Sequence, residues 1–260
     1  YSISQELKLA RSMVATPLVA GEDKVGTLVV LHSDEYGLDH NDAKVLSAFS
    51  DNVSVALENA RLVKDSIEKE HYKRELELAR DMQRKLLPQE LPHIENYSLS
   101  AFSVPAEEVG GDFYDIGTLK DGRKCIIIGD VSGKGMNAAF YMAQLKGVAL
   151  SEMKEATGAA DLLKRINRVL LNSVEKKVLI TINALTIDDN DGKISLARAG
   201  HMPAVIKNSN GIEFLKTKGI GTCLVDSSKF DIMLEEVDLK LHEGGLCLLF
   251  TDGLNELRDE

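Results

Sequence analysis

Three short segments of the chain place an aspartate beside glycine in a setting that suits metal chemistry. They are VGGDFYD at 109–115, IIIGDVSGKG at 126–135 and LLFTDG at 248–253. In the last two, Asp130 and Asp252 end an apolar run that reads as a buried strand, so the strand fixes a carboxylate that opens onto a loop. If these aspartates and Asp112 meet at one sheet edge, they form an all-oxygen site, which favours Mg²⁺ or Mn²⁺ over Zn²⁺.

Such a site indicates phosphoester hydrolysis. Two divalent ions can activate a bridging water and neutralise the charge that develops on a phosphate under attack, so no protein nucleophile is needed. The sequence has no GxSxG motif, and its three cysteines, Cys125, Cys223 and Cys247, lie in apolar contexts. For each aspartate taken alone, the alternative is a turn residue, because Asp beside Gly commonly ends a strand.

The SGKG segment at 132–135 is not a phosphate-binding P-loop. The spacing from Gly129 is one residue short, and Gly135 stands where a Ser or Thr should hold Mg²⁺. Gly133 and Gly135 are instead interpreted as residues that let the backbone turn tightly into a helix.

Two further motifs have open interpretations. GGDF resembles the first part of the GGDEF signature of diguanylate cyclases, but Phe113 replaces the acidic fourth residue, and Asp130 and Asp252 would have no role. His201, at the turn in ARAGHMP, is either a hydrogen-bonded structural residue or an acid or ligand. Arg198 either contacts a phosphate or pairs with a surface carboxylate.

The elements that would position these residues are strands with a few helices. Strands are predicted at 97–104, 113–119, 124–128, 178–187, 193–198, 204–207, within 230–241, and at 245–251, with helices at 136–153 and 159–174. Strands, then two helices, then strands predict an α+β layered domain. An earlier hairpin is predicted over 13–31, around the turn at 21–23.

A long helix is predicted between the hairpin and the strand-rich region, from an N-cap at Asp39 to about residue 87. Its apolar residues alternate at spacings of three and four: Leu46, Phe49, Val53, Ala56, Ala60, Val63 and Ile67. This repeat predicts a coiled coil, and a new apolar phase from Tyr72 through Gln83 to Leu86 shifts the register by two residues. The alternatives are a solvated linker helix and a parallel dimer helix whose second half docks on the next domain. In the second, the shift near Ile67–Tyr72 couples the two parts.

Composition excludes several classes of function. The chain has 260 residues, which predicts two domains, and its net charge of −10 disfavours nucleic-acid binding. No apolar run approaches a membrane span, and no secretion signal is visible. An odd number of cysteines without CxxC argues against disulfides and zinc, so a cytoplasmic protein is expected.

Five motifs in order, ARDMQRKLLP, VGGDFYD, GDVSGKGMNAAFYMA, ARAGHMP and FTDGLNE, resemble the SpoIIE/RsbU-like branch of the bacterial type 2C serine/threonine protein phosphatases. The resemblance covers roughly 75–260 and implies an αββα sandwich with two Mn²⁺ or Mg²⁺ ions. Asp112 and Asp130 would be ligands, with Asp130 bridging both ions, together with the Val131 carbonyl and Asp252. Gly111, Gly133, Arg198 and His201 are possible supporting residues.

The resemblance also implies a substrate and a regulator. Such enzymes use metal-activated water on a phosphorylated STAS-domain anti-anti-sigma factor in a partner-switching pathway. Residues 1–63 resemble the second half of a GAF domain, which would bind an unknown small ligand. The expected organisation is therefore a partial GAF domain at 1–63, a dimeric coiled-coil linker at 64–90 and a phosphatase domain at 91–260.

One departure from the family pattern leaves an alternative function open. Family members carry a further Asp-Asp ligand motif after the TDG segment, whereas this chain ends at Asp259-Glu260, so the phosphatase domain is expected to be truncated. The alternative is a non-catalytic pseudophosphatase that sequesters a partner, against which the retained Asp112, Asp130 and Asp252 argue.

Overall fold

The computed structural model describes residues 10–105, 108–175 and 178–255. The chain divides into two compact units, Tyr1–Glu75 and Leu76–Glu260, and each is described here by itself. The final Asp259-Glu260 lies outside the described residues. No helix in the described part of the chain has an apolar stretch long enough to cross a membrane.

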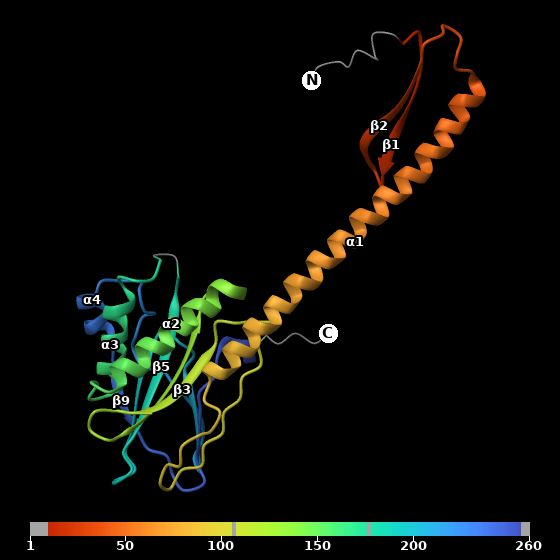
Figure 1. Cartoon of the computed structure of the whole chain (residues 1–260). Coiled ribbons are helices and arrows are strands. Elements are labelled where there is room, and N and C mark those ends of the chain that lie inside the picture. The colour runs from red at the N-terminus through yellow and green to blue at the C-terminus, as the bar shows by residue number, and fades with distance from the viewer. Residues whose placement is uncertain (1–9, 106–107, 176–177, 256–260) are drawn as a thin grey trace. The chain divides into compact units, whose positions relative to one another are not determined.

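The first unit contains the predicted hairpin. Strands β1 (Ser12–Ala20) and β2 (Asp23–His32) pair antiparallel (Figure 1). Gly21, in the turn between them, has a φ of 61°, a left-handed conformation that glycine adopts without steric cost.

Helix α1 (His40–Leu86) begins with a reciprocal cap. The Asp39 carboxylate accepts hydrogen bonds from the backbone N–H groups of Asn41 and Asp42, and the Asp42 carboxylate accepts one from the Asp39 N–H. These contacts satisfy donors that a helix N-terminus leaves free, and they confirm the predicted N-cap.

One face of α1 packs on the hairpin. Leu46, Ser50 and Ser54 are buried along a stripe with a spacing of four residues. The Ser50 hydroxyl donates to the Pro17 carbonyl at 2.7 Å, and the Ser54 hydroxyl accepts from the Val19 N–H at 3.0 Å. Leu46, the first residue of the predicted seam, lies on this buried stripe.

The rest of the predicted seam is largely open to solvent. Phe49 and Val63 are each 59% exposed, and Ile67 is 64% exposed. The helix is continuous through Ile67 and Tyr72, because no Pro or Gly interrupts residues 40–86. The register shift is thus a change of face on one helix and not a break.

The second unit is built on two antiparallel sheets. The larger has the strand order β3-β4-β5-β6-β9 and the smaller β10-β7-β8. Their strands are β3 (Phe113–Thr118), β4 (Lys124–Val131), β5 (Ile180–Ile187), β6 (Ile194–Ala199), β7 (Ala204–Asn208), β8 (Gly211–Leu215), β9 (Glu236–Leu239) and β10 (Leu246–Leu248).

The central strands β5 and β6 of the larger sheet are buried on both faces, which suits their largely apolar sequences. In β5, Ile180 and Ile182 join the core formed with helices α2 (Gly135–Met153) and α3 (Ala159–Leu170), whereas Leu185 joins a second core with residues of β7 and β10. Figure 1 shows α2 and α3 beside this sheet. The described residues thus form a helix layer and two sheet layers.

That architecture bears on the expected fold class. The expected αββα sandwich has two helix layers, and among the described residues α2 and α3 form the helix layer on the five-stranded sheet. What the structure supports is the coarser statement, a mixed α/β fold.

Two strand predictions were wrong. Residues 97–104 form no strand: only a single bridge joins Ile94 to Tyr97, and Pro105 cannot donate a ladder hydrogen bond. Phe230 lies in α4 (Ser227–Met233), whose N-cap Asp226 accepts from the Lys229 N–H, so only β9 remains of the predicted 230–241 region.

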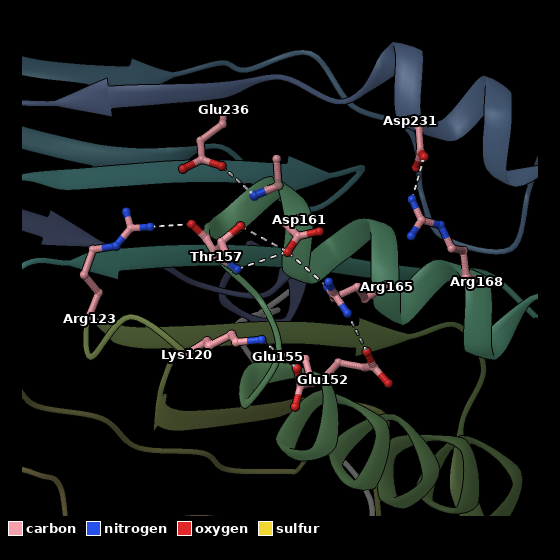
Figure 2. Close-up of polar contacts among 11 residues, drawn as sticks. Lys120, Arg123, Glu152, Glu155, Thr157, Asp161, Arg165, Arg168, Asp231 and Glu236 are labelled. Atoms are coloured by element: carbon pink, nitrogen blue, oxygen red, sulfur yellow. Dashed lines mark hydrogen bonds and ion pairs between the residues drawn. The ribbon is translucent and has the colours of Figure 1, made fainter.

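A polar cluster holds α3 in place (Figure 2). Glu236 of β9 accepts from the Ala160 N–H at 2.7 Å, in the first turn of α3. Asp161 accepts from the Thr157 N–H and from Arg165, which also reaches Glu152 of α2 at 3.7 Å. The cluster satisfies helix-end donors and joins α2, α3 and β9.

Candidate metal centre

The register of β3 and β4 brings the first two predicted ligands together. Phe113 pairs with Gly129, so Asp112, just before β3, lies opposite Asp130 near the end of β4. The turn between these strands is short, so the juxtaposition depends only on antiparallel pairing. Val131, which follows Asp130, buries its side chain in the core and leaves its carbonyl oxygen at the site.

The third aspartate segment, which contains Asp252, lies near the C-terminal end of the sequence and contacts the segment of Asp112. Asp252 begins the short 3₁₀ helix η2 (Asp252–Leu254), after β10. The Thr251 hydroxyl donates to Oδ2 of Asp112 at 2.8 Å, although the two residues are 139 positions apart. The structure therefore gathers the segments of Asp112, Asp130 and Asp252 at one edge of the sheets.

Gly111 is present because the backbone is crowded at this edge. A Cβ on Gly111 would lie 2.3 Å from the Val131 carbonyl oxygen and 3.1 Å from Oδ1 of Asp130. Any larger residue would displace two of the oxygen atoms expected to bind metal.

The raised pKa values of the clustered aspartates indicate a site that favours a cation. Burial, followed by the charges of Asp112 and Asp252, raises the pKa of Asp130 to about 7. Burial also raises the pKa of Asp112, and the charge of Asp252 acts in the same direction, so the metal-free site favours a bound proton. A divalent cation would replace this proton and relieve the repulsion between carboxylates. Nevertheless, no three His, Cys, Asp or Glu side chains of the described residues are already grouped to hold a metal ion.

We predict from this pKa that divalent cations bind more weakly as the pH falls. Below about pH 7, a proton on Asp130 competes with the cation, so the apparent Mn²⁺ affinity falls by up to about tenfold per pH unit. The raised pKa of Asp130 also affects the stability of the metal-free protein. The contribution of Asp130 to the free energy of unfolding is present at low pH and is lost as the pH rises from about 4 to 7. The Mn²⁺-induced increase in Tm should be larger at pH 8 than at pH 6, and equal increases would contradict the prediction.

Gln83 links the last turns of α1 to this site. Its side-chain nitrogen donates to the Gly110 carbonyl at 2.6 Å, and its side-chain oxygen accepts from the Gly110 N–H at 3.1 Å. Leu86 packs against the main core of the same unit. The amide thus holds the segment that immediately precedes Gly111 and Asp112.

His201 is linked to the site through the Thr181 hydroxyl. It is 3% exposed, its Nδ1 lies 2.8 Å from the Thr181 hydroxyl, and that hydroxyl is 3.5 Å from the Asp130 carbonyl. Burial lowers the pKa of His201 to about 4, so the ring is neutral at physiological pH. Among its two interpretations, the geometry favours a hydrogen-bonded structural residue.

Of the two interpretations of Arg198, the structure does not show pairing with a surface carboxylate among the described residues, and contact with a phosphate stays a prediction. Its guanidinium donates to the backbone carbonyls of Thr217 and His201, and it forms no ion pair with a described carboxylate. Arg198 is partly buried, and these carbonyls accept hydrogen bonds from its guanidinium. The side chain thereby connects the loops that carry Thr217 and His201.

The two glycines after Asp130 have the predicted conformations. Gly133 has a φ of 106° and Gly135 a φ of 70°, both in the region that favours glycine. They let the chain turn from β4 into α2, as the sequence indicated.

A family model for stage II sporulation protein E, SpoIIE, matches residues 120–260, which include Asp130 and Asp252. The chain belongs to the SpoIIE family. Membership of this family argues against the diguanylate cyclase alternative, because the aspartates left unexplained by that motif fall inside the match.

Relatives of the SpoIIE family extend the similarity towards the N-terminus. Phosphoserine phosphatase RsbU of Bacillus subtilis is 31% identical over 189 residues, which cover 72% of this chain and 55% of RsbU. Phosphoserine phosphatase RsbP of the same organism is 27% identical over 186 residues, covering 70% of this chain and 45% of RsbP. The chain thus spans about half the length of these relatives.

A solved structure agrees on the fold. The SiaA-PP2C domain of Pseudomonas aeruginosa superposes with a TM-score of 0.56 at 18% identity, covering 72% of this chain and 74% of that domain. This likeness supports a PP2C-like α/β fold for the SpoIIE-family unit.

Sequence reasoning missed two supporting residues. Thr251 lies in the TDG motif beside Asp252, and this position could have indicated a role at the site. Thr181 carried no such signal, because only the pairing of Asp130 with Thr181 across β4 and β5 brings it there.

Proposed function

We propose that the chain is the catalytic part of a metal-dependent phosphatase that acts on phosphoserine or phosphothreonine in proteins. The observation that carries the proposal is the convergence of Asp112, Asp130 and Asp252 at one edge within a SpoIIE-family fold. The related proteins named as phosphoserine phosphatases support the same reaction class.

The residues of the chain have distinct parts in this proposal. Asp112, Asp130, Asp252 and the Val131 carbonyl would hold two Mn²⁺ or Mg²⁺ ions, with Asp130 between them. When bound, the ions would supply an activated water and offset the charge on the phosphate. Thr251 fixes one oxygen of Asp112 by its hydrogen bond, and Gly111 leaves room for the Asp130 and Val131 oxygens.

The substrate we propose is a serine-phosphorylated STAS-domain protein, as the family resemblance implies. The experiment is phosphate release from this protein and from p-nitrophenyl phosphate, with Mn²⁺ or with EDTA. Mn²⁺-dependent release supports the proposal. Binding of the phosphoprotein without release would favour a pseudophosphatase, and release in EDTA would refute metal dependence.

We further propose that α1 transmits a signal to the site. A sensor of the GAF type at 1–63 would act through the helix, and the register change between Ile67 and Tyr72 would provide two alternative pairings. Gln83 supports this route, because it joins the end of α1 to the segment that carries Asp112.

Replacing Gln83 by alanine is expected to lower phosphatase activity about tenfold, because the Gly110 backbone loses both partners and Asp112 is held less firmly. The matched control is Gln89→Ala, whose amide donates only to the Arg84 and Leu87 carbonyls. The measurement is kcat/KM with Mn²⁺ at several concentrations. Equal values for the two variants would leave Gln83 without a positioning role.

The open seam on α1 supports a homodimer. Ile67→Glu should shift the chain towards monomer in analytical ultracentrifugation, because a charge in an a/d seam is costly. Val55→Glu is the control, since Val55 is 61% exposed but lies off the seam. If both variants sediment like the parent, the seam is not a dimer contact.

A further inference from the structure

A pocket of about 570 Å³ opens directly after the metal-binding segment. Its walls come from the loop after Val131, the first turns of α2 and the segment after α3; they include Ser132, Lys134, Asn137, Phe140, Tyr141 and Glu175. Only Val131 separates Ser132 from Asp130 in the chain, so the pocket adjoins the proposed reaction site.

The wall nearest the site is fixed to the sheet. The Ser132 N–H donates to the Leu179 carbonyl at 2.8 Å, and the Ser132 hydroxyl accepts from the Leu179 N–H at 2.9 Å. These paired hydrogen bonds extend the contact between β4 and β5 by one residue. The pocket therefore has a preformed side, which lowers the entropic cost of binding.

The pocket presents an aromatic side chain and a cation to solvent. Phe140 is 67% exposed, although it lies in the second turn of a helix that otherwise packs on the core. Lys134 forms no ion pair with any described residue. Exposed aromatics in a hollow are typical anchor points for protein partners, and an unpaired lysine favours an acidic side chain of the partner.

We propose that this pocket docks the polypeptide that flanks the phosphorylated residue of the substrate. This inference rests on the proposed phosphatase function. An extended segment would place an apolar side chain against Phe140 and Tyr141, and Lys134 would contact an acidic side chain that flanks the phosphorylated residue. In this proposal the metal centre does not distinguish one phosphoester from another. The pocket provides the preference for phosphoserine within a protein segment.

The test compares two substrates on Phe140→Ala and Lys134→Ala, at saturating Mn²⁺. For a serine-phosphorylated STAS-domain protein, kcat/KM should fall by about tenfold or more, whereas p-nitrophenyl phosphate, which has no flanking segment, should change by less than about twofold. Phe214→Ala is the matched control, because Phe214 is 61% exposed on β8 and outside the pocket.

The outcomes separate the two proposals. A parent chain that hydrolyses neither substrate refutes the phosphatase function, and the docking inference with it. If the parent chain hydrolyses both substrates, two results would overturn only the docking inference. In one, the variants lose activity on both substrates to the same extent; in the other, they lose activity on neither. Lys134→Glu provides a second variant, and a Tm equal to that of the parent would show that charge reversal at this exposed position leaves the fold unchanged.

Discussion

Asp130→Asn is expected to abolish Mn²⁺-dependent phosphate release, by roughly 10³-fold or more. Asp130 lies opposite Asp112, and the charge of Asp252 contributes to its raised pKa, so in the proposed site it is the carboxylate that would be shared between ions. An amide keeps the shape but supplies neither the charge nor the second anionic oxygen. Phosphate release and calorimetric Mn²⁺ titration measure the loss. Asp81→Asn, on the exposed side of α1, removes the same charge elsewhere and should leave both unchanged.

The same variant has a stability signature that a purely structural role would not produce. Because the folded-state pKa of Asp130 is raised to about 7, the metal-free fold carries a charged Asp130 above that pH, and this charge destabilises the fold relative to the unfolded chain. Asparagine removes this penalty, so the metal-free Tm at pH 8 should be equal to or higher than that of the parent. A clearly lower Tm would identify Asp130 as a residue that stabilises the fold, and loss of activity would then carry no catalytic meaning.

Gly111→Ala is expected to reduce activity by roughly 10²-fold, since displacement of reacting groups by about 1 Å has effects of this size. The new Cβ would stand 2.3 Å from the Val131 carbonyl oxygen, which is backbone and cannot rotate away. Either β4 or the segment of Asp112 must move. The destabilisation expected from such overpacking is about 1–3 kcal/mol.

The neighbouring glycine provides the control for this substitution. A Cβ on Gly110 would meet only Pro105 Cβ, at 3.8 Å, and the backbone hydrogen bonds to Gln83 would remain. Gly110→Ala should therefore keep activity and Mn²⁺ affinity within about twofold. If the two alanine variants lose activity to the same extent, backbone flexibility and not the space beside Val131 explains the effect.

Local signals in the sequence were sufficient for much of this protein. Antiparallel strands separated by a short turn must pair, so Asp112 and Asp130 could be expected together from spacing alone. The cap at Asp39, the unbroken helix over 40–86 and the left-handed glycines at 133 and 135 also depend on neighbours in sequence.

Short and weakly patterned elements were not predictable in this way. β8 and α4 have five and seven residues, too few for a hydrophobic period to show. Residues 97–104 alternate like a strand but find no partner to pair with, and strand formation requires one. Arg198 could not be assigned because its acceptors, the Thr217 and His201 carbonyls, are made available only by loop geometry.

The sequence by itself determined which residue types could bind metal and which strand ends would carry them. The tertiary structure decided that Thr251 contacts Asp112, that Gln83 holds Gly110 and that Leu46 is buried while the rest of the seam stays open. The physical reason is the range of the interactions. Caps, turns and strand pairs are set by residues close in the chain, whereas contacts between distant segments depend on how the sheets and helices pack.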